Sequence, residues 1–331
     1  APIREIHISD AGHFGIARLN AAQHDLAALG YTIGNRQLGA ALWRAIEHSP
    51  QIELRTPARV SAVALGPQWA QLTVQGDAGA DSVLQARLVV AADGAHSLVK
   101  QAAGIDSSAR DYQQVALVAN LRTDRSADGV AFERFTATGP LALLPLADGA
   151  YTVVWTLAPD VARAMCDCSE DEFCRALQES FGWRAGQVLA VGKRASYALS
   201  LVRAQELTAE RVALIGNAAQ ALHPIAAQGF NLGLRDAAML AELIAAADDP
   251  GAQQVLARFA QQRAADRGGM IAFTDQLVKL FSTRRGPAIA ARTLALLLFD
   301  LSPPAKRALS RLSWGFGGSL PRLSRGLALR P

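Results

Sequence analysis

The chain has 331 residues, half of them apolar, and a formal net charge of +4 at neutral pH. This length gives room for about two domains with a sizeable core, and no apolar run approaches the roughly 18 residues that span a bilayer. The three cysteines, Cys166, Cys168 and Cys174, are one ligand short of a typical structural zinc site, and their odd number suits a reducing compartment. The composition therefore favours a cytoplasmic enzyme without a metal over a secreted or membrane-spanning protein.

The first part of the chain alternates short strands with a helix. Residues 1–34 and 52–92 are typical of short strands, and the segment between them predicts a helix that opens at Asn35 and Arg36. Apolar residues recur at helical spacing along that segment. This alternation predicts an α/β domain.

The strand predicted over residues 88–92 is continuously apolar, as in a parallel sheet that is covered on both faces. It ends at Asp93 and Gly94. Taken alone, this pair is a common turn, so its functional meaning depends on what lies beside it.

Between residues 115 and 201 the pattern changes to alternating strands. Two short acidic helices interrupt five predicted strands, whose sequences are VALVANL, VAFERF, LALLPL, YTVVWTL and ASYALSL. This pattern predicts a mainly antiparallel sheet inserted into an α/β domain. We expect this sheet to form the substrate-side domain.

The stretch from Arg211 to Glu242 carries the clearest functional signal. An apolar strand ends at Gly216, a polar turn follows, and a second loop around Gln228 leads into a long apolar helix. Backbone N–H groups converge on a ligand oxygen at such a junction. The amide of Asn217 can donate and accept hydrogen bonds, which suits a sugar or ribityl hydroxyl. From spacing alone, the alternative is an ordinary β-loop-α connection with glycines at its turns.

The last segment of the chain is strongly basic. From Lys279 to Pro331 ten residues are basic and only Asp300 is acidic, so the segment carries a net charge of +9. A short apolar run at residues 294–299 lies within it. Basic residues beside an apolar helix predict attraction to an anionic membrane surface. The alternative is a packed helical cap with a solvated basic face. Nucleic acid is disfavoured, because aromatic residues are few and are not interleaved with the charges.

Two of these motifs together carry a resemblance to a known family. The string from Gly216 to Asn231 resembles the second flavin-binding motif of the FAD-dependent aromatic-ring hydroxylases, which are built like p-hydroxybenzoate hydroxylase. Its form here, G-N-A-A-Q followed by H-P-I-A-A-Q-G-F-N, is most like the 2-polyprenyl-6-methoxyphenol hydroxylases of ubiquinone biosynthesis. Asp93 to Lys100 is similar to the family's D-G-x-x-S-x-x-R motif, with lysine in place of arginine. Ala227 stands where glycine is usual, and we expect it at a positive φ.

The resemblance implies FAD and NAD(P)H as cofactors and a set of residues that hold them. An N-R-x-L element in the family places its arginine against the flavin. His223 is the candidate catalytic residue, with the alternative that it braces its own loop. The implied cofactor-binding residues are Arg36, Asp93, Gly94, Gly216, Asn217, Ala218, Pro224, Gln228, Gly229 and Asn231.

The family's first motif has no counterpart in this sequence. A strand, a G-x-G-x-x-G turn and a helix open the family pattern, and no such turn occurs in these residues. We therefore expect an FAD-binding three-layer domain that lacks its first βαβ unit, and residues 1–331 alone are expected to hold no stoichiometric FAD and to be inactive. The predicted domains are an FAD-binding domain at 1–110 and 203–285, with residues 1–34 able to cross into the substrate sheet, a substrate domain at 111–202, and a basic helical C-terminal segment at 286–331.

The function that the resemblance implies is hydroxylation of a lipophilic phenol. NAD(P)H reduces the flavin, which activates O2 to hydroxylate a polyprenylated phenol in ubiquinone biosynthesis. The implied partners are that phenol, other ubiquinone-biosynthesis proteins and, through the basic C-terminus, the surface of the inner membrane. Two alternatives stay open: an FAD-dependent oxidoreductase of the same fold that inserts no oxygen, and a non-catalytic component of a quinone-biosynthesis assembly.

Overall fold

The structure is a computed structural model that describes residues 1–76, 81–282, 286–314 and 320–329. The chain forms two compact units, each described by itself below. The first comprises residues 1–48, 112–199 and 276–310, and the second comprises residues 49–111, 200–275 and 311–331. The predicted domain limits stay a prediction, and the one at residue 285 lies outside the described residues.

The strands are β1 (Pro2–Ile3), β2 (Glu5–Asp10), β3 (Ile16–Asn20), β4 (Gly30–Tyr31), β5 (Ala58–Leu65), β6 (Ala70–Gly76), β7 (Asp81–Ala86), β8 (Val89–Ala91), β9 (Ser107–Thr123), β10 (Val130–Thr136), β11 (Gly139–Pro145), β12 (Tyr151–Leu157), β13 (Val188–Val191), β14 (Ala195–Ala204), β15 (Thr208–Ala209), β16 (Val212–Leu214) and β17 (Gln220–Ala221). The helices are α1 (Asn35–Glu47), α2 (Leu98–Ala102), α3 (Pro159–Asp167), α4 (Glu170–Phe181), α5 (Gln228–Ala245), α6 (Gln253–Ser282), α7 (Gly286–Asp300) and α8 (Pro303–Ser313). All five strands predicted between residues 115 and 201 form, and so do the helix predicted to open at Asn35 and the long helix expected after the loop around Gln228.

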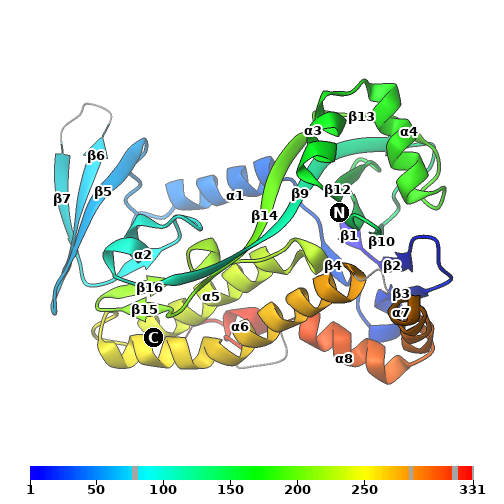
Figure 1. Cartoon of the computed structure of the whole chain (residues 1–331). Helices are drawn as coiled ribbons and strands as arrows, with labels where there is room; N and C mark the ends of the chain where they lie inside the picture. Colours follow the sequence, from blue (N-terminus) through cyan, green and yellow to red (C-terminus); the bar gives the residue numbers. More distant parts are fainter. Residues whose placement is uncertain (77–80, 283–285, 315–319, 330–331) are drawn as a thin grey trace. The chain divides into compact units, whose positions relative to one another are not determined.

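The first unit is built on one mainly antiparallel sheet (Figure 1). From β14 onward its strands lie in the order β14–β9–β12–β11–β10–β2–β3, and β13 also pairs with β9. From β9 to β3 every pair is antiparallel except β10 with β2, which run parallel, and β13 is antiparallel to β9. Strand β2 comes from the first ten residues, so the start of the chain completes this sheet.

One face of this sheet is buried beneath α3 and α4 (Figure 1). Side chains that alternate along each strand, among them Leu117, Phe132 and Val153, pack against Phe173 and Phe181 of α4. Helix α4 begins at a capping box, in which the Ser169 side chain and the third residue of the helix each accept a backbone N–H. Burying each large apolar side chain stabilises the unit by about 1.5–3 kcal/mol.

The second unit holds a small sheet in the order β15–β16–β8 and a separate antiparallel sheet, β5–β6–β7. Strands β8 and β16 run parallel, with Val89 opposite Val212 and Ala91 opposite Leu214. The apolar strand predicted at residues 88–92 is thus a parallel strand. Helices α5 and α6 pack against the small sheet through a core that includes Leu240 and the fully buried Phe259.

Candidate functional site

Two predicted motifs meet at one edge of the β8–β16 sheet. The strands are parallel and in register, and the backbone N–H of Ile215 donates to the carbonyl of Ala91 over 3.0 Å. Asp93 and Gly94 therefore leave the sheet at the same edge as Gly216. In α/β proteins, ligands bind outside the carboxyl ends of parallel strands. The sheet brings together motifs that lie more than 100 residues apart in the sequence.

Gly216 turns the chain sharply at the end of β16. Its φ is +57°, and a short 3-10 helix spans Gly216–Ala218. Ala218 is buried beneath the turn, while the side chain of Asn217 is exposed. A Cβ at Gly233 in α5 would lie only 3.0 Å from the Gly216 Cα, so the helix and the turn pack backbone to backbone. Two glycines are therefore required here, one for conformation and one for close approach.

The second loop enters α5 through Ala227, which has φ +49° and ψ +37°. The positive φ expected at this position is confirmed. A left-handed conformation costs a non-glycine residue about 1–2 kcal/mol, and the Asn231 amide supports it by donating to the Ala227 carbonyl over 3.3 Å. Gln228 and Gly229 form the first turn of α5 directly after this residue.

His223 is buried just before Pro224, inside the same loop. Its Nδ1 accepts the backbone N–H of Ile225 over 3.2 Å. Burial lowers the pKa of the imidazole to about 4, so the ring stays neutral at neutral pH. A neutral ring whose Nδ1 accepts carries its proton on Nε2. These contacts favour the bracing role, and a catalytic role for His223 stays a prediction.

Asp93 caps the helix that follows β8. One of its carboxylate oxygens accepts the backbone N–H of Leu98 over 3.0 Å, and Ser97 accepts that of Lys100 over 2.9 Å. Gly94 holds a φ of +88° in the turn between them. The Lys100 side chain is buried and donates to the carbonyl of Ala95 over 2.8 Å. The described contacts of Lys100 thus lie within its own turn.

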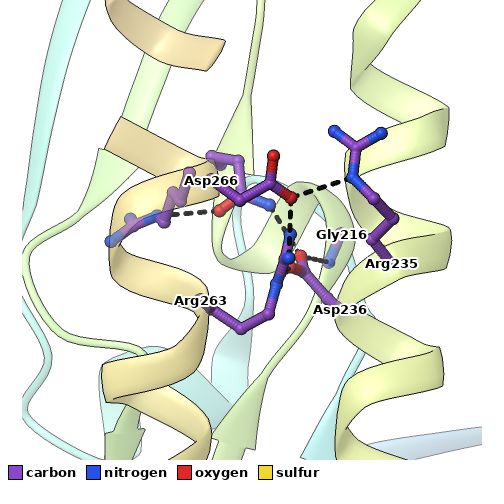
Figure 2. Close-up of polar contacts among 7 residues, drawn as sticks. Gly216, Arg235, Asp236, Arg263 and Asp266 are labelled. Carbon is purple, nitrogen blue, oxygen red and sulfur yellow. Dashed lines mark hydrogen bonds and ion pairs between the residues drawn. The ribbon is translucent and has the colours of Figure 1, made fainter. Parts of the chain in front are cut away.

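A buried ionic network lies beneath the Gly216 turn (Figure 2). One oxygen of Asp236 in α5 accepts the Gly216 N–H over 3.2 Å, and the other accepts Nε of Arg263 in α6 over 2.7 Å. Asp236 and Arg263 are both fully inaccessible to solvent. Asp266 continues the network by accepting Arg263 over 2.7 Å and Arg235 over 2.8 Å. Two helices are thereby tied to the turn that ends β16.

Gln220 connects the network to the far side of the turn. Its amide donates to Asp236 over 2.8 Å, and its carbonyl accepts Nε of Arg267 over 2.8 Å. Arg267 also donates to the backbone carbonyls of Ala204 and Ala219. Burial lowers the pKa of Arg267 to about 10, so the guanidinium remains charged at neutral pH. Burial raises the pKa of the Asp236 carboxyl, against the opposing attraction of Arg263.

Sequence reasoning missed this network. Its signal was a charged residue inside an apolar stripe: Asp236 falls in helical register with Leu232, Met239 and Leu243, which are all buried. A charge in that position requires a buried partner. Nothing in the sequence names Arg263 as that partner, because the pairing depends on how α5 and α6 pack.

Arg36 belongs to the first unit, whereas the other implied cofactor-binding residues belong to the second. It lies in the first turn of α1, and its side chain is exposed. The contact of Arg36 with a flavin stays a prediction.

Known proteins resemble this chain in sequence and in fold. The family described as "FAD binding domain" matches residues 23–274. Ubiquinone hydroxylase UbiL of Rhodospirillum rubrum is 36% identical over 99% of this chain and 77% of its own length. The 3-demethoxyubiquinol 3-hydroxylase of Escherichia coli is 32% identical over 87% of this chain and 73% of its own length.

The solved structures agree at the level of fold. p-Nitrophenol 4-monooxygenase PnpA of Pseudomonas putida superimposes with a TM-score of 0.78 at 19% identity, over 96% of this chain and 82% of that one. HpxO of Klebsiella pneumoniae, solved with FAD and uric acid, gives a TM-score of 0.73 at 15% identity, over 95% of this chain and 81% of that one.

Proposed function

Because this chain belongs to the FAD-binding domain family, we propose that it is a flavin-dependent monooxygenase that hydroxylates a polyprenylated phenol in ubiquinone biosynthesis. The names of the two relatives describe a ubiquinone hydroxylase and a 3-demethoxyubiquinol 3-hydroxylase. They match 99% and 87% of this chain, respectively. The observation that carries the proposal is the junction at the ends of β8 and β16, where Asp93 and Gly216 leave adjacent parallel strands.

The residues at this junction fit the ribityl and flavin half of FAD. The exposed Asn217 offers an amide, and Gly216 leaves the space above the turn free of a side chain. The first turn of α5 supplies backbone N–H groups that have no partner within the helix. We assign Gly216, Asn217, Gln228 and Gly229 to this half, and Asp93 to the edge of the diphosphate.

When bound at these residues, flavin would supply the redox chemistry, in which NAD(P)H is oxidised and one atom of O2 enters the ring while the other leaves as water. The protein holds the phenol, excludes water and accepts or returns protons. The buried network under Gly216 supports flavin binding by holding the turn in place, because a preorganised turn binds its ligand without reordering.

The test of this function uses the full-length protein. We expect an absorption spectrum with the two flavin bands, and NAD(P)H consumption with O2 that yields a 2-polyprenylphenol carrying one additional oxygen, detected by mass spectrometry. Peroxide release without a hydroxylated product would instead support an oxidoreductase that inserts no oxygen. A protein that binds no flavin would support a non-catalytic component.

We further propose that α7 of the first unit lies on an anionic membrane surface. The leucine stripe consists of three leucines of α7 and the residue directly after the helix: Leu294, Leu297, Leu298 and Leu301 are 57, 39, 58 and 79% exposed, respectively. The spacing of three, four and seven residues places these leucines on one side of the helix. Basic residues of α8, among them the exposed Arg307, follow directly, and each charge near an anionic surface contributes about 1 kcal/mol. No helix among the described residues is long and apolar enough to cross a bilayer.

Vesicle binding should therefore require both the stripe and the charge. We expect cosedimentation with phosphatidylglycerol vesicles that falls as salt rises to 0.5 M, where the screening length is about 4 Å. Leu294→Ser with Leu298→Ser should weaken it, whereas Leu189→Ser, an exposed leucine on β13 of the same unit, should not. Binding that ignores salt and both leucines would refute the proposal, and concentration-dependent dimerisation lost with the stripe would assign the stripe to a second copy.

A further inference from the structure

The two faces of the sheet in the first unit differ in how deeply their side chains are buried. The face beneath α3 and α4 is fully buried. Side chains on the opposite face are half-buried along the central strands, among them Ile8, Val118, Ala142 and Val154. The centre of this face is aliphatic from Ile8 to Val118, so it suits an apolar ligand. Polar side chains (Asn120, Thr152 and Thr156) lie beside this centre, and Phe281 of α6 covers Phe135 at the end of β10.

One carboxyl group stands in the middle of this apolar face. Glu133 of β10 pairs with Ile8 of β2 and with Ala142 of β11, and Ala142 pairs in turn with Val154 of β12. Paired residues point their side chains to the same face. Glu133 therefore lies at the centre of a row of aliphatic side chains, where a carboxylate loses solvation.

No hydrogen bond or ion pair joins the Glu133 carboxyl to the residues that the structure describes. Burial raises its pKa to about 7. The nearest charged group on this face of β2 is Asp10, which is held by Arg292 over 2.7 Å. The adjacent positions of β11 and β12 carry no titratable group, and Arg122 stands at the far end of β9. Arg134 and His7 occupy the opposite face, toward α4.

A carboxyl that has no partner in the protein is costly unless a ligand uses it. A phenol with a prenyl tail matches this face, because it is apolar apart from one acidic hydroxyl. We propose that Glu133 is a catalytic residue that binds the substrate's phenolic hydroxyl on the half-buried face of β10 and accepts its proton. This inference rests on the proposed function, since it assigns the base for that same reaction.

The proton step is balanced. The O–H bond of the phenol breaks, its electron pair stays on the phenol oxygen, and the proton forms a new O–H bond on the Glu133 carboxylate. As the proton leaves, electron density moves from the phenol oxygen into the ring, which makes the ortho and para carbons nucleophilic. The carboxylic acid returns its proton to solvent after hydroxylation. General-base catalysis of this kind contributes about 100- to 10,000-fold to a rate.

The test compares Glu133→Gln with wild type in the full-length holoenzyme. We expect kcat/KM for 2-geranylphenol to fall about 100- to 10,000-fold. In wild type, kcat/KM should rise with pH through a limb near pH 7, as the carboxylate forms, and this limb should vanish in the variant. Glu133→Asp should keep the limb at a lower rate. Glu179→Gln, which changes an exposed residue of α4, should match wild type.

A second readout does not depend on turnover. Ultraviolet difference spectra of bound 2-geranylphenol report the hydrogen bond that its hydroxyl donates, and we expect a red shift at pH 8 with wild type that is smaller with Glu133→Gln. A variant that retains wild-type kcat/KM, the pH limb and the red shift would overturn the assignment of Glu133 while leaving the proposed function intact. Wild type that reduces O2 without hydroxylating the phenol would instead overturn the proposed function.

Discussion

Replacing Asp236 with alanine is expected to lower the free energy of unfolding by about 3–5 kcal/mol. The change leaves the Arg263 guanidinium buried without its carboxylate, and an unpaired buried charge costs about this much. It also removes the acceptor of the Gly216 N–H and of the Gln220 amide. Urea denaturation of wild type and variant measures the difference.

The chain offers a matched control for this variant. Arg211 pairs with Asp249 over 2.6 Å in the same unit, but the Asp249 side chain is 37% exposed. Asp249→Ala should therefore lower the free energy of unfolding much less than Asp236→Ala does, because solvent screens an exposed ion pair. The double variant Asp236→Leu with Arg263→Met should recover part of the loss, since apolar residues replace buried pairs at little cost. Equal effects of the two alanine variants would contradict the importance of burial.

The second large effect is expected on cofactor affinity. Asn217→Leu should raise the Kd for FAD about 5- to 150-fold, corresponding to the roughly 1–3 kcal/mol that a lost polar contact costs. The fold should be unchanged, because the Asn217 side chain is exposed and no described residue accepts or donates to it. Flavin fluorescence titration of the full-length apoprotein measures the Kd.

Gln261→Leu provides the comparison, because it removes an exposed amide from α6 in the same unit. Its Kd for FAD should equal that of wild type, and both variants should melt at the wild-type temperature. An unchanged Kd in Asn217→Leu would remove this side chain from the flavin site. A raised Kd in both variants would indicate a general effect of exposed leucine rather than a lost contact.

Local patterns were sufficient for much of the fold. Alternating apolar residues predicted β9 to β12, since the side-chain period of a strand is visible in the sequence. The glycine and proline positions between residues 216 and 231 predicted a tight turn and a second loop. The positive φ at Ala227 was expected from the resemblance, because alanine stands here at a position where the family motif has glycine.

The sequence by itself determined the family, the order of the elements and the residues of the two flavin motifs. These properties reside in short strings, in which local periodicity, turn chemistry and residue identity are all present. The family match over residues 23–274 and the relative at 36% identity confirm the family, whereas the flavin contacts of the motif residues stay a prediction. The sequence could not specify which strands would be neighbours, because pairing depends on contacts between distant segments.

Only the tertiary structure decided three features. Parallel pairing of β8 with β16 placed Asp93 beside the Gly216 turn. Packing of α5 against α6 matched Asp236 with Arg263 across 27 residues of sequence. Pairing of β10 with β2 put Glu133 among aliphatic side chains and left its carboxyl without a partner among the described residues. In each case the energy of a charged group depends on its surroundings, and only the folded chain creates those surroundings.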